Sequence, residues 1–281
     1  MALLGSVRKR LESPDADWRT FETSAWAKRH LLRPSDPSVS VVIPAKNESE
    51  NISWVLSRLP SCVKEVIVVD GRSQDSTAAI VRAVCPAAKV IEHGNSGKGN
   101  AIATGLLVAQ GDVIVMLDAD GSMDPVEIPL YLEALCSGAD LVKGSRTIAG
   151  GGSQDQTFVR RVGNWALGVF SNVVYQQSWS DLCYGYAAFW KDSLDHLGLD
   201  ELCTQRPERQ ASTLWRGPWY GHGFEIEALI YCRAARAHLQ IAEVFSHEYK
   251  RRSGESHLAT WRDGGRVMFA ILRELRWQPR R

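Results

Sequence analysis

The chain has 281 residues, 44% of them hydrophobic, which is enough for one large α/β domain or two small ones. Its 33 Lys and Arg side chains nearly balance 32 Asp and Glu side chains, so the net charge of +1 gives no argument for nucleic acid as a partner. No apolar run reaches the roughly 18 to 20 residues of a membrane-spanning helix, and the N-terminus carries charges where a secretory signal needs an apolar core. We therefore expect a cytoplasmic protein, either soluble or peripheral at the inner face of the membrane.

The cysteines stand singly, without a C-x-x-C pair or a Cys/His spacing that would suit zinc. We expect them to be reduced thiols, as is usual in the cytosol. They are Cys62, Cys85, Cys136, Cys183, Cys203 and Cys232.

Residues 1–38 mix charges, tryptophans and prolines, and are interpreted as an N-terminal extension with a helix near 16–31. From residue 39 onward, short apolar runs alternate with helix-like stretches of about ten residues, which predicts right-handed βαβ units and a doubly wound, mostly parallel sheet. The runs that predict strands are 38–44, 65–70, 88–92, 113–118 and 139–144, and the intervening helices are expected at 48–59, 75–84, 99–110 and 125–138.

This rhythm changes after residue 146. A glycine-rich loop over 150–156 is followed by an apolar stretch that suits a helix over 162–175. We expect the second half to decorate the same sheet rather than to fold as an independent domain. Its further predicted elements are a strand over 181–190, a helix over 223–237, a strand over 238–249 and a last helix over 258–277.

Two aspartates, Asp118 and Asp120, directly follow the apolar run that ends at Leu117. Alternate side chains of an extended segment point the same way, so both carboxylates can face one hard cation while Ala119 turns aside. An isolated Asp-Ala-Asp-Gly would fit a polar turn equally well. The surrounding sequence must therefore decide between the two interpretations.

Polar clusters follow three more of the predicted strands, over 44–48, 70–75 and 94–99. The carboxyl ends of strands in an open α/β sheet are where ligands bind. Two nucleotide motifs fail in these clusters. Glu92 stands where a P-loop would need its first glycine, Gly99 replaces the Ser or Thr that would hold magnesium, and the glycines of 94–105 do not form G-x-G-x-x-G. A Walker ATPase and a Rossmann dehydrogenase are both disfavoured.

Together the clusters resemble the inverting glycosyltransferases of family 2, which have the GT-A fold, and in detail the branch with dolichol-phosphate mannosyltransferase and bacterial polyprenyl-phosphate sugar transferases. Gly71, Ser122 and His257 depart from the residues usual in that branch. The resemblance is carried by VVIPAKNESENI (41–52), VIVVDGRSQDST (66–77), GKGNAIATG (97–105), GDVIVMLDADGSMDP (111–125), GADLVKGSR (138–146) and the R-x-x-G-x-S stretch of 251–256.

The resemblance implies a nucleotide-sugar site in the half over 39–146. Asp118 would lie near the ribose and the metal, and Asp120 would ligate Mg²⁺ or Mn²⁺. His247, which precedes the basic run 250–252, could by its position reach the metal or the diphosphate, with a purely structural histidine as the alternative. Such a cation neutralises the charge that develops on a departing diphosphate. The residues implied to frame the nucleoside base are Pro44, Ala45, Glu48 and Asp70, and those implied elsewhere in the donor site are Lys98, Ala119 and Arg146.

The half over 147–281 would bind the acceptor. An alcohol acceptor needs a general base, for which Glu225, Glu227 and then Asp181 are candidates, whereas a phosphate acceptor needs cations such as Arg146 and the run Lys250–Arg252, which includes Arg251. Ordinary solvated helix residues and a solvated charge run remain the alternatives. The last helix interleaves apolar and Arg residues, which suits either a lipid interface or packing on the domain.

These features lead to one functional prediction: a metal-dependent, inverting glycosyltransferase that moves a hexose from a UDP- or GDP-linked donor to a polyprenyl phosphate or a small hydroxyl acceptor. A homodimer is left open. A sugar-1-phosphate nucleotidyltransferase is the alternative, but it needs a glycine-rich loop after the first strand that PAKNESEN does not supply. A non-catalytic nucleotide-sugar-binding protein is the other alternative.

Overall fold

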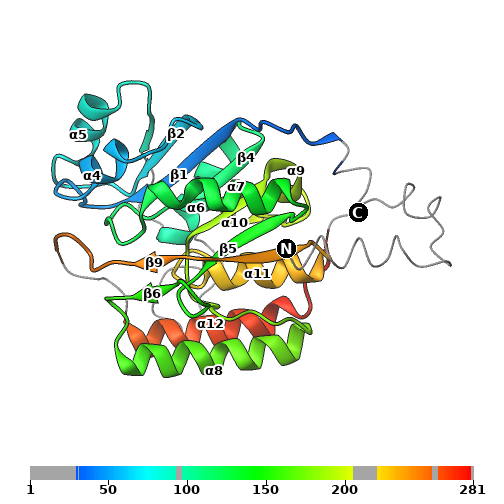
Figure 1. The fold of residues 1–281 in the computed structure, drawn as a ribbon. Helices are drawn as coiled ribbons and strands as arrows, with labels where there is room; N and C mark the ends of the chain where they lie inside the picture. Colours follow the sequence, from blue (N-terminus) through cyan, green and yellow to red (C-terminus); the bar gives the residue numbers. More distant parts are fainter. Residues whose placement is uncertain (1–29, 31, 93–96, 205–219, 255–258, 280–281) are drawn as a thin grey trace.

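A computed structural model describes residues 30, 32–92, 97–204, 220–254 and 259–279. Within these residues, seven strands form one sheet in the order β3-β2-β1-β4-β7-β5-β8, and only β7 runs antiparallel to its neighbours (Figure 1). The strands are β1 (Val39–Ala45), β2 (Val63–Asp70), β3 (Lys89–Glu92), β4 (Val113–Met116), β5 (Leu141–Ser145), β7 (Ala187–Trp190) and β8 (Ile241–Phe245). Two short strands, β6 (Gly152–Ser153) and β9 (His247–Glu248), pair in parallel beside this sheet.

Helices cover both faces of the sheet. On one face lie α4 (Ile52–Ser57), α5 (Thr77–Val84) and α7 (Ile128–Cys136), the last preceded by the 3₁₀ turn η1 (Pro125–Glu127). On the other lie α6 (Lys98–Val108) and α11 (Ile226–Arg236), with α10 (Asp200–Thr204) against α6. The short α9 (Lys191–Leu194) follows β7. Two long helices, α8 (Phe158–Tyr175) and α12 (Thr260–Glu274), form an outer layer over α11 (Figure 1).

The predicted doubly wound, mostly parallel α/β architecture is confirmed. Strand β4 is apolar throughout, and β1 is apolar apart from the buried Ser40, because both faces of these strands are buried under helices. Strands β7 and β8, which come after residue 146, join β1–β5 in the same sheet, so the second half of the chain contributes to the same core.

Two predicted strands are shorter than the sequence indicated. Only the last part of 181–190 is a strand, and Asp181 at the start of this stretch pairs with Arg146 outside the sheet. The predicted strand over 238–249 divides into β8 and β9 at the buried Ser246, whose backbone N–H donates to the carbonyl of Ser145.

Several predictions fall on residues outside the described ranges, among them the helix near 16–31 and the segment 93–96. The five cysteines whose side chains are described are all unpaired, as expected for thiols, and the side chain of Cys203 lies outside that set. None of the helices in the described ranges is both long and apolar enough to cross a membrane.

Candidate active site

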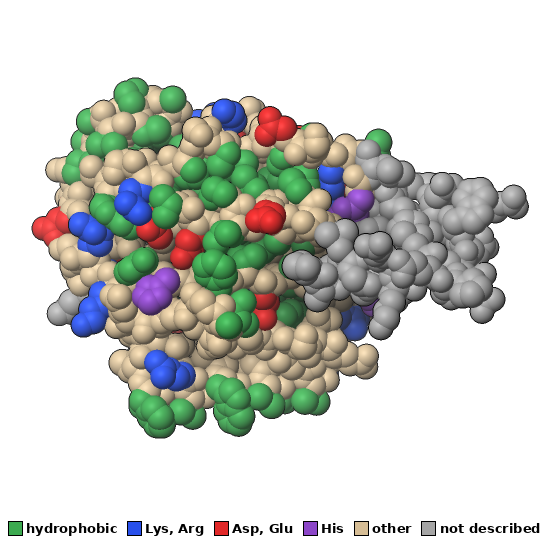
Figure 2. Space-filling model, in the orientation of Figure 1, with side chains coloured by type: hydrophobic (Ala, Val, Ile, Leu, Met, Phe, Trp, Pro, Cys, Tyr) green, Lys and Arg blue, Asp and Glu red, His purple; other side chains and the backbone are tan. Residues whose placement is uncertain are grey.

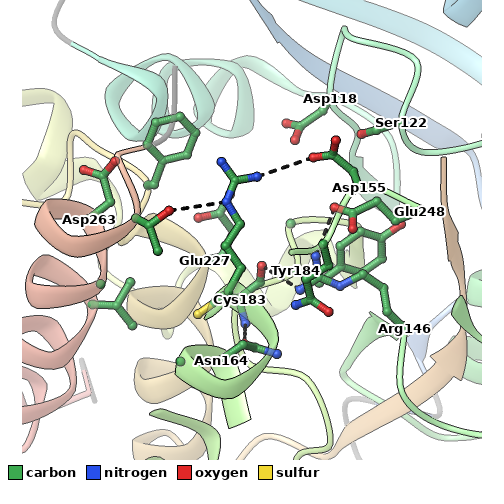
Figure 3. A pocket seen from close by; sticks show the side chains of 18 of the residues that line it. Asp118, Ser122, Arg146, Asp155, Asn164, Cys183, Tyr184, Glu227, Glu248 and Asp263 are labelled. Atoms are coloured by element: carbon green, nitrogen blue, oxygen red, sulfur yellow. Dashed lines mark hydrogen bonds and ion pairs between the residues drawn. The ribbon is translucent and has the colours of Figure 1, made fainter. Parts of the chain in front are cut away.

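A cleft of about 220 Å³ lies between the carboxyl ends of β4 and β5 and the outer helices α8 and α12 (Figure 3). The rim of the sheet contributes Asp118 and Asp120, and α11 contributes Glu227 from behind. Of the residues described, six acidic and four basic side chains line the cleft, so its charge favours an added cation. They are Asp118, Asp120, Asp155, Glu227, Glu248 and Asp263, and Lys98, Arg146, Arg160 and Arg251.

Asp118 and Asp120 both reach this cleft, although each is largely shielded, with 25% and 22% of its side chain exposed. Ala119 between them is buried in the core, which turns the two carboxylates to the same side. Gly121 follows with a positive φ of 75° and lets Ser122 N–H donate to Asp120 at 2.9 Å. The tight turn therefore holds the Asp120 carboxylate at the cleft.

Lys98 is positioned by the glycines on either side of it. Gly97 has a φ of 104° immediately before α6, and a Cβ on Gly99 would lie only 2.0 Å from the carbonyl oxygen of Gly221. This close approach brings the ammonium of Lys98 to 2.9 Å from both Asp118 and Glu227. Burial lowers the pKa of Lys98, but the two carboxylates outweigh burial and raise the pKa overall, so the lysine stays charged.

The two candidate glutamates have different surroundings. Glu227 lines the cleft, and burial raises its pKa against the opposing effect of Lys98. Glu225 accepts two hydrogen bonds from Arg266, at 2.6 and 2.8 Å, and a further one from the backbone N–H of Gly221, and it is not among the lining residues. Both side chains are buried, so neither is a solvated helix residue. The structure brings Glu227 to the cleft and leaves Glu225 in the packing of α12.

Arg251 lies between two carboxylates from the first half of the chain. Its guanidinium is 2.5 Å from Glu48 and 3.4 Å from Asp120. Burial raises the pKa of Glu48, and hydrogen bonds from Asn51 and Arg251 act in the opposite direction. The backbone N–H of Arg252 also donates to the Asp120 carbonyl at 3.3 Å. Arg251 is therefore part of the site, whereas Lys250 and Arg252 are exposed beside it.

The other residues expected at the nucleoside lie at the ends of β1 and β2. Pro44 and Ala45 close β1, and Asp70 closes β2 directly opposite Ala45. The Asp70 carboxylate is buried and accepts hydrogen bonds from the backbone N–H and the hydroxyl of Ser73. These three residues share the rim with Asp118 but do not line the cleft.

Arg146 lines the cleft, but its guanidinium is occupied by other side chains. It pairs with both oxygens of Asp181, at 2.7 and 2.9 Å, and with Glu248 at 3.0 Å. Asn164 of α8 donates to the same Asp181 at 2.8 Å, and Asp181 is fully buried. Arg146 thus holds the wall of the cleft in place, and Asp181, which is bound to it, does not line the cleft.

Residues from α8 and α12 complete the cleft, and no sequence motif marks them as site residues. Figure 3 shows Asn164 and Asp263 facing the cleft from these two helices, opposite Asp118. Arg160 spans this side, 3.5 Å from Asp155 and 3.4 Å from the hydroxyl of Thr260. Their role depends on how two distant helices pack, which no local motif encodes.

His247 does not join the aspartates. Its ring lies 4.7 Å from that of Tyr249, its backbone N–H donates to Glu127, and it is not a lining residue. In the described ranges no group of three or more His, Cys, Asp or Glu side chains is arranged to hold a metal ion. Even without a third protein ligand, Asp118 and Asp120 fit a cation such as Mg²⁺, which is commonly held by one or two carboxylates together with substrate phosphates.

Residues 40–198 match the family model described as Glycosyl transferase family 2. The chain belongs to this family. It is 32% identical over 248 residues to the undecaprenyl-phosphate mannosyltransferase of Micrococcus luteus, a match that covers 85% of this chain and 93% of that protein. It is also 29% identical over 205 residues to the polyprenol monophosphomannose synthase of Mycolicibacterium smegmatis, covering 69% and 76% of the two chains.

The fold is also similar to that of solved glycosyltransferases. A crystal structure of glucosyl-3-phosphoglycerate synthase from Mycobacterium tuberculosis, in complex with Mn²⁺, UDP and glucosyl-3-phosphoglycerate, matches with a TM-score of 0.61 and 20% identity, over 85% of this chain and 80% of that one. The chain therefore has the GT-A fold, and it is a family 2 glycosyltransferase, as its motifs predicted.

Proposed function

We propose that this glycosyltransferase moves a hexosyl group from a UDP- or GDP-linked donor to a polyprenyl phosphate, with inversion at the sugar and with Mg²⁺ or Mn²⁺ as cofactor. The observation that carries the proposal is the cleft in which Asp118 and Asp120 lie beside Lys98 and Arg251. The two named relatives are a mannosyltransferase and a phosphomannose synthase that use polyprenyl acceptors, which favours mannose as the sugar and a polyprenyl phosphate as the acceptor.

The donor would lie along the rim formed by β1, β2 and β4. The nucleoside base would contact Pro44, Ala45 and Asp70. Glu48 would border the same site through its ion pair with Arg251. Asp118 and Asp120 would hold the cofactor, which when bound neutralises charge on the leaving diphosphate. Arg251, fixed beside Asp120 by Glu48, adds a second positive charge to the same place.

A phosphate acceptor needs no general base because it is already anionic. It needs cations to hold it, and Lys98, Arg160 and Arg251 line the cleft. Glu227 would then act by positioning the ammonium of Lys98, which lies 2.9 Å away. A small hydroxyl acceptor is the second candidate. It is favoured by one observation, that Glu227 is a buried carboxylate in the cleft with a raised pKa, as a general base requires.

A direct assay separates these two acceptors. The enzyme is incubated with Mn²⁺ and radiolabelled GDP-mannose or UDP-glucose, together with either a short-chain, water-soluble prenyl phosphate or the matching prenyl alcohol. Transfer to the phosphate alone is expected, and it should disappear in Asp120→Asn but persist in Asp195→Asn, an exposed aspartate beyond α9. Transfer to the alcohol alone would replace the proposed acceptor and make Glu227 the base.

A further inference from the structure

Helix α8 has its apolar side turned outward. Its exposed stripe repeats at helical spacing and is between 45% and 78% exposed, through Phe158, Val162, Trp165, Val169 and Val173. Its buried positions are instead Asn164, Gly168, Ser171 and Tyr175. A helix on the surface of a soluble domain normally buries its apolar stripe and exposes its polar one. Among the residues that the structure describes, the outer side of α8 therefore has no packing partner.

Helix α12 extends the same apolar surface. Trp261 is 85% exposed, and Phe269 and Leu272 are close to half exposed. The two helices lie side by side in the outer layer (Figure 1), and Figure 2 shows hydrophobic side chains gathered along the lower edge of the molecule, where α8 lies. We call this surface the apolar platform. It consists of Phe158, Val162, Trp165, Val169 and Val173 of α8 with Trp261, Phe269 and Leu272 of α12.

The exposed charges of these two helices are all positive. Helix α8 contains no acidic residue, and Arg161 is exposed beside its stripe. On α12, Arg262 and Arg273 are exposed. Both acidic residues of α12 are buried: Glu274 pairs with Arg233, and Asp263 accepts from the backbone N–H of Ala259. An apolar surface edged by arginines complements an anionic lipid surface.

A second copy of the chain is a poorer occupant for the same reason. A two-fold symmetric contact would place the same patch on both sides. Arg161 and Arg273 of one copy would then approach the arginines of the other. Helix α8 has no acidic side chain to neutralise them, and the two acidic side chains of α12 are buried and already paired, Glu274 with Arg233 and Asp263 with Arg262 at 3.4 Å.

The platform and the cleft are opposite sides of the same two helices. Asn164 and Leu167 of α8 and Val267 of α12 line the cleft, while the outward side chains of those helices form the platform. A bilayer in contact with the platform would therefore be separated from the cleft by one layer of helices, about 10 Å thick.

We propose that the apolar platform docks the enzyme on the surface of an anionic lipid bilayer, with α8 and α12 lying in the interface. This inference deepens the proposed function and rests on it only for the choice of a lipid acceptor, because binding to the bilayer is a separate property. Trp and Phe side chains would enter the headgroup region while Arg161, Arg262 and Arg273 meet lipid phosphates.

The test is co-sedimentation of the full chain with vesicles, without donor or acceptor. Vesicles of phosphatidylglycerol and phosphatidylcholine are compared with vesicles of phosphatidylcholine alone. The variants are Phe158→Ser/Trp165→Ser, which removes two exposed apolar groups, and Arg161→Glu/Arg262→Glu, which reverses two exposed charges. The matched control is Leu107→Ser, because Leu107 is 49% exposed on α6, outside the outer layer. Circular dichroism checks that each variant folds.

The wild-type protein and the Leu107 variant are expected to sediment with anionic vesicles. The apolar double variant should lose at least about tenfold in partitioning, since the apolar contact of a buried Trp or Phe is worth more than a factor of ten. The charge-reversal variant should bind anionic vesicles more weakly than wild type does, whereas its binding to phosphatidylcholine vesicles should not change. Wild-type protein that stays in the supernatant, or an apolar double variant that binds like wild type, would overturn the proposal. So would a wild-type dimer that the same double variant dissociates.

The two proposals fail separately in these experiments. Transfer to a water-soluble prenyl phosphate tests the function without any bilayer, and the apolar double variant should retain that transfer. If the enzyme binds vesicles but transfers only to an alcohol, the docking surface is supported and the prenyl phosphate is excluded as the acceptor.

Discussion

The guanidinium of Arg251 lies 2.5 Å from the carboxylate of Glu48, although 203 positions separate the two residues in the chain. This contact joins the loop after β9 to the loop after β1, at the point where Asp120 also lies 3.4 Å from Arg251. Glu48 is buried, and a buried carboxylate is costly without a cationic partner. The ion pair therefore holds the loop after β9 against the rim of the sheet.

Replacing Arg251 by alanine should lower kcat/KM for transfer by about 100-fold or more, because it removes a charge beside Asp120 and leaves Glu48 unpaired. The KM for the donor should rise. Steady-state kinetics with varied donor measure both effects. Arg252→Ala is the matched control, since the Arg252 side chain is exposed and stacks on the ring of Trp54 at 4.9 Å. Equal losses in the two variants would contradict a specific role for Arg251.

Glu225 and Glu227 should separate stability from activity. Glu225→Gln breaks a buried pair with Arg266 and is expected to cost about 3–5 kcal/mol of unfolding free energy, measured by urea denaturation. Glu227→Gln should cost far less stability, because Lys98 keeps Asp118 as a partner, but should lower transfer by about 10–100-fold through a displaced ammonium. A Glu225 variant that is stable and inactive would reverse these assignments.

Gly99→Ala should impair activity through Lys98. The added Cβ would meet the backbone of Gly221 at 2.0 Å, so α6 must move away from the segment before α11. The ammonium of Lys98 would move with it. We expect a loss of transfer of about tenfold or more, accompanied by a lower Tm. Gly265→Ala is the control, because a Cβ there meets nothing within 4 Å and Gly265 does not line the cleft, and it should keep wild-type transfer without a lower Tm.

The loop beside the donor rim should have a pH-dependent stability. Burial raises the pKa of Asp75, but hydrogen bonds from Thr77 and Ser49 outweigh it and hold the pKa at about 2, below the ordinary 3.8. A lowered pKa contributes stability that is full above the unfolded value and is lost as the pH falls through the folded one. The Tm of wild type minus that of Asp75→Asn should therefore be constant above about pH 4 and shrink between pH 4 and pH 2. A difference that grows on acidification would contradict the assignment.

The elements that carry the rim follow from local patterns. Apolar runs marked β1, β2 and β4 correctly, and the polar residues that follow them lie on one edge because the strands are parallel. The position of Asp118 and Asp120 was predictable for that reason. In the sequence, the residues around Lys98 only exclude a P-loop. The structure shows that Gly99 allows the close contact with Gly221.

Contacts between distant segments were not predictable from those patterns. The pair of Arg251 with Glu48 and the wall formed by Asn164 and Asp263 depend on how the second half folds back over the first. The apolar stretch over 162–175 predicts a helix correctly, but the sequence does not indicate which side of that helix faces the core. The structure shows Trp165 outward and Asn164 inward, because Asn164 donates to the buried Asp181.

The metal-dependent transfer proposed for Asp120 is measured as formation of glycosyl prenyl phosphate by wild type and by Asp120→Asn across a titration of Mn²⁺ into metal-free enzyme. Wild type should be inactive without the cation and should recover activity when the cation is added. Asp120→Asn should stay at least about 1,000-fold less active at saturating Mn²⁺ with an unchanged Tm. Full transfer by wild type in the presence of a chelator, or full transfer by the Asp120 variant, would refute this role.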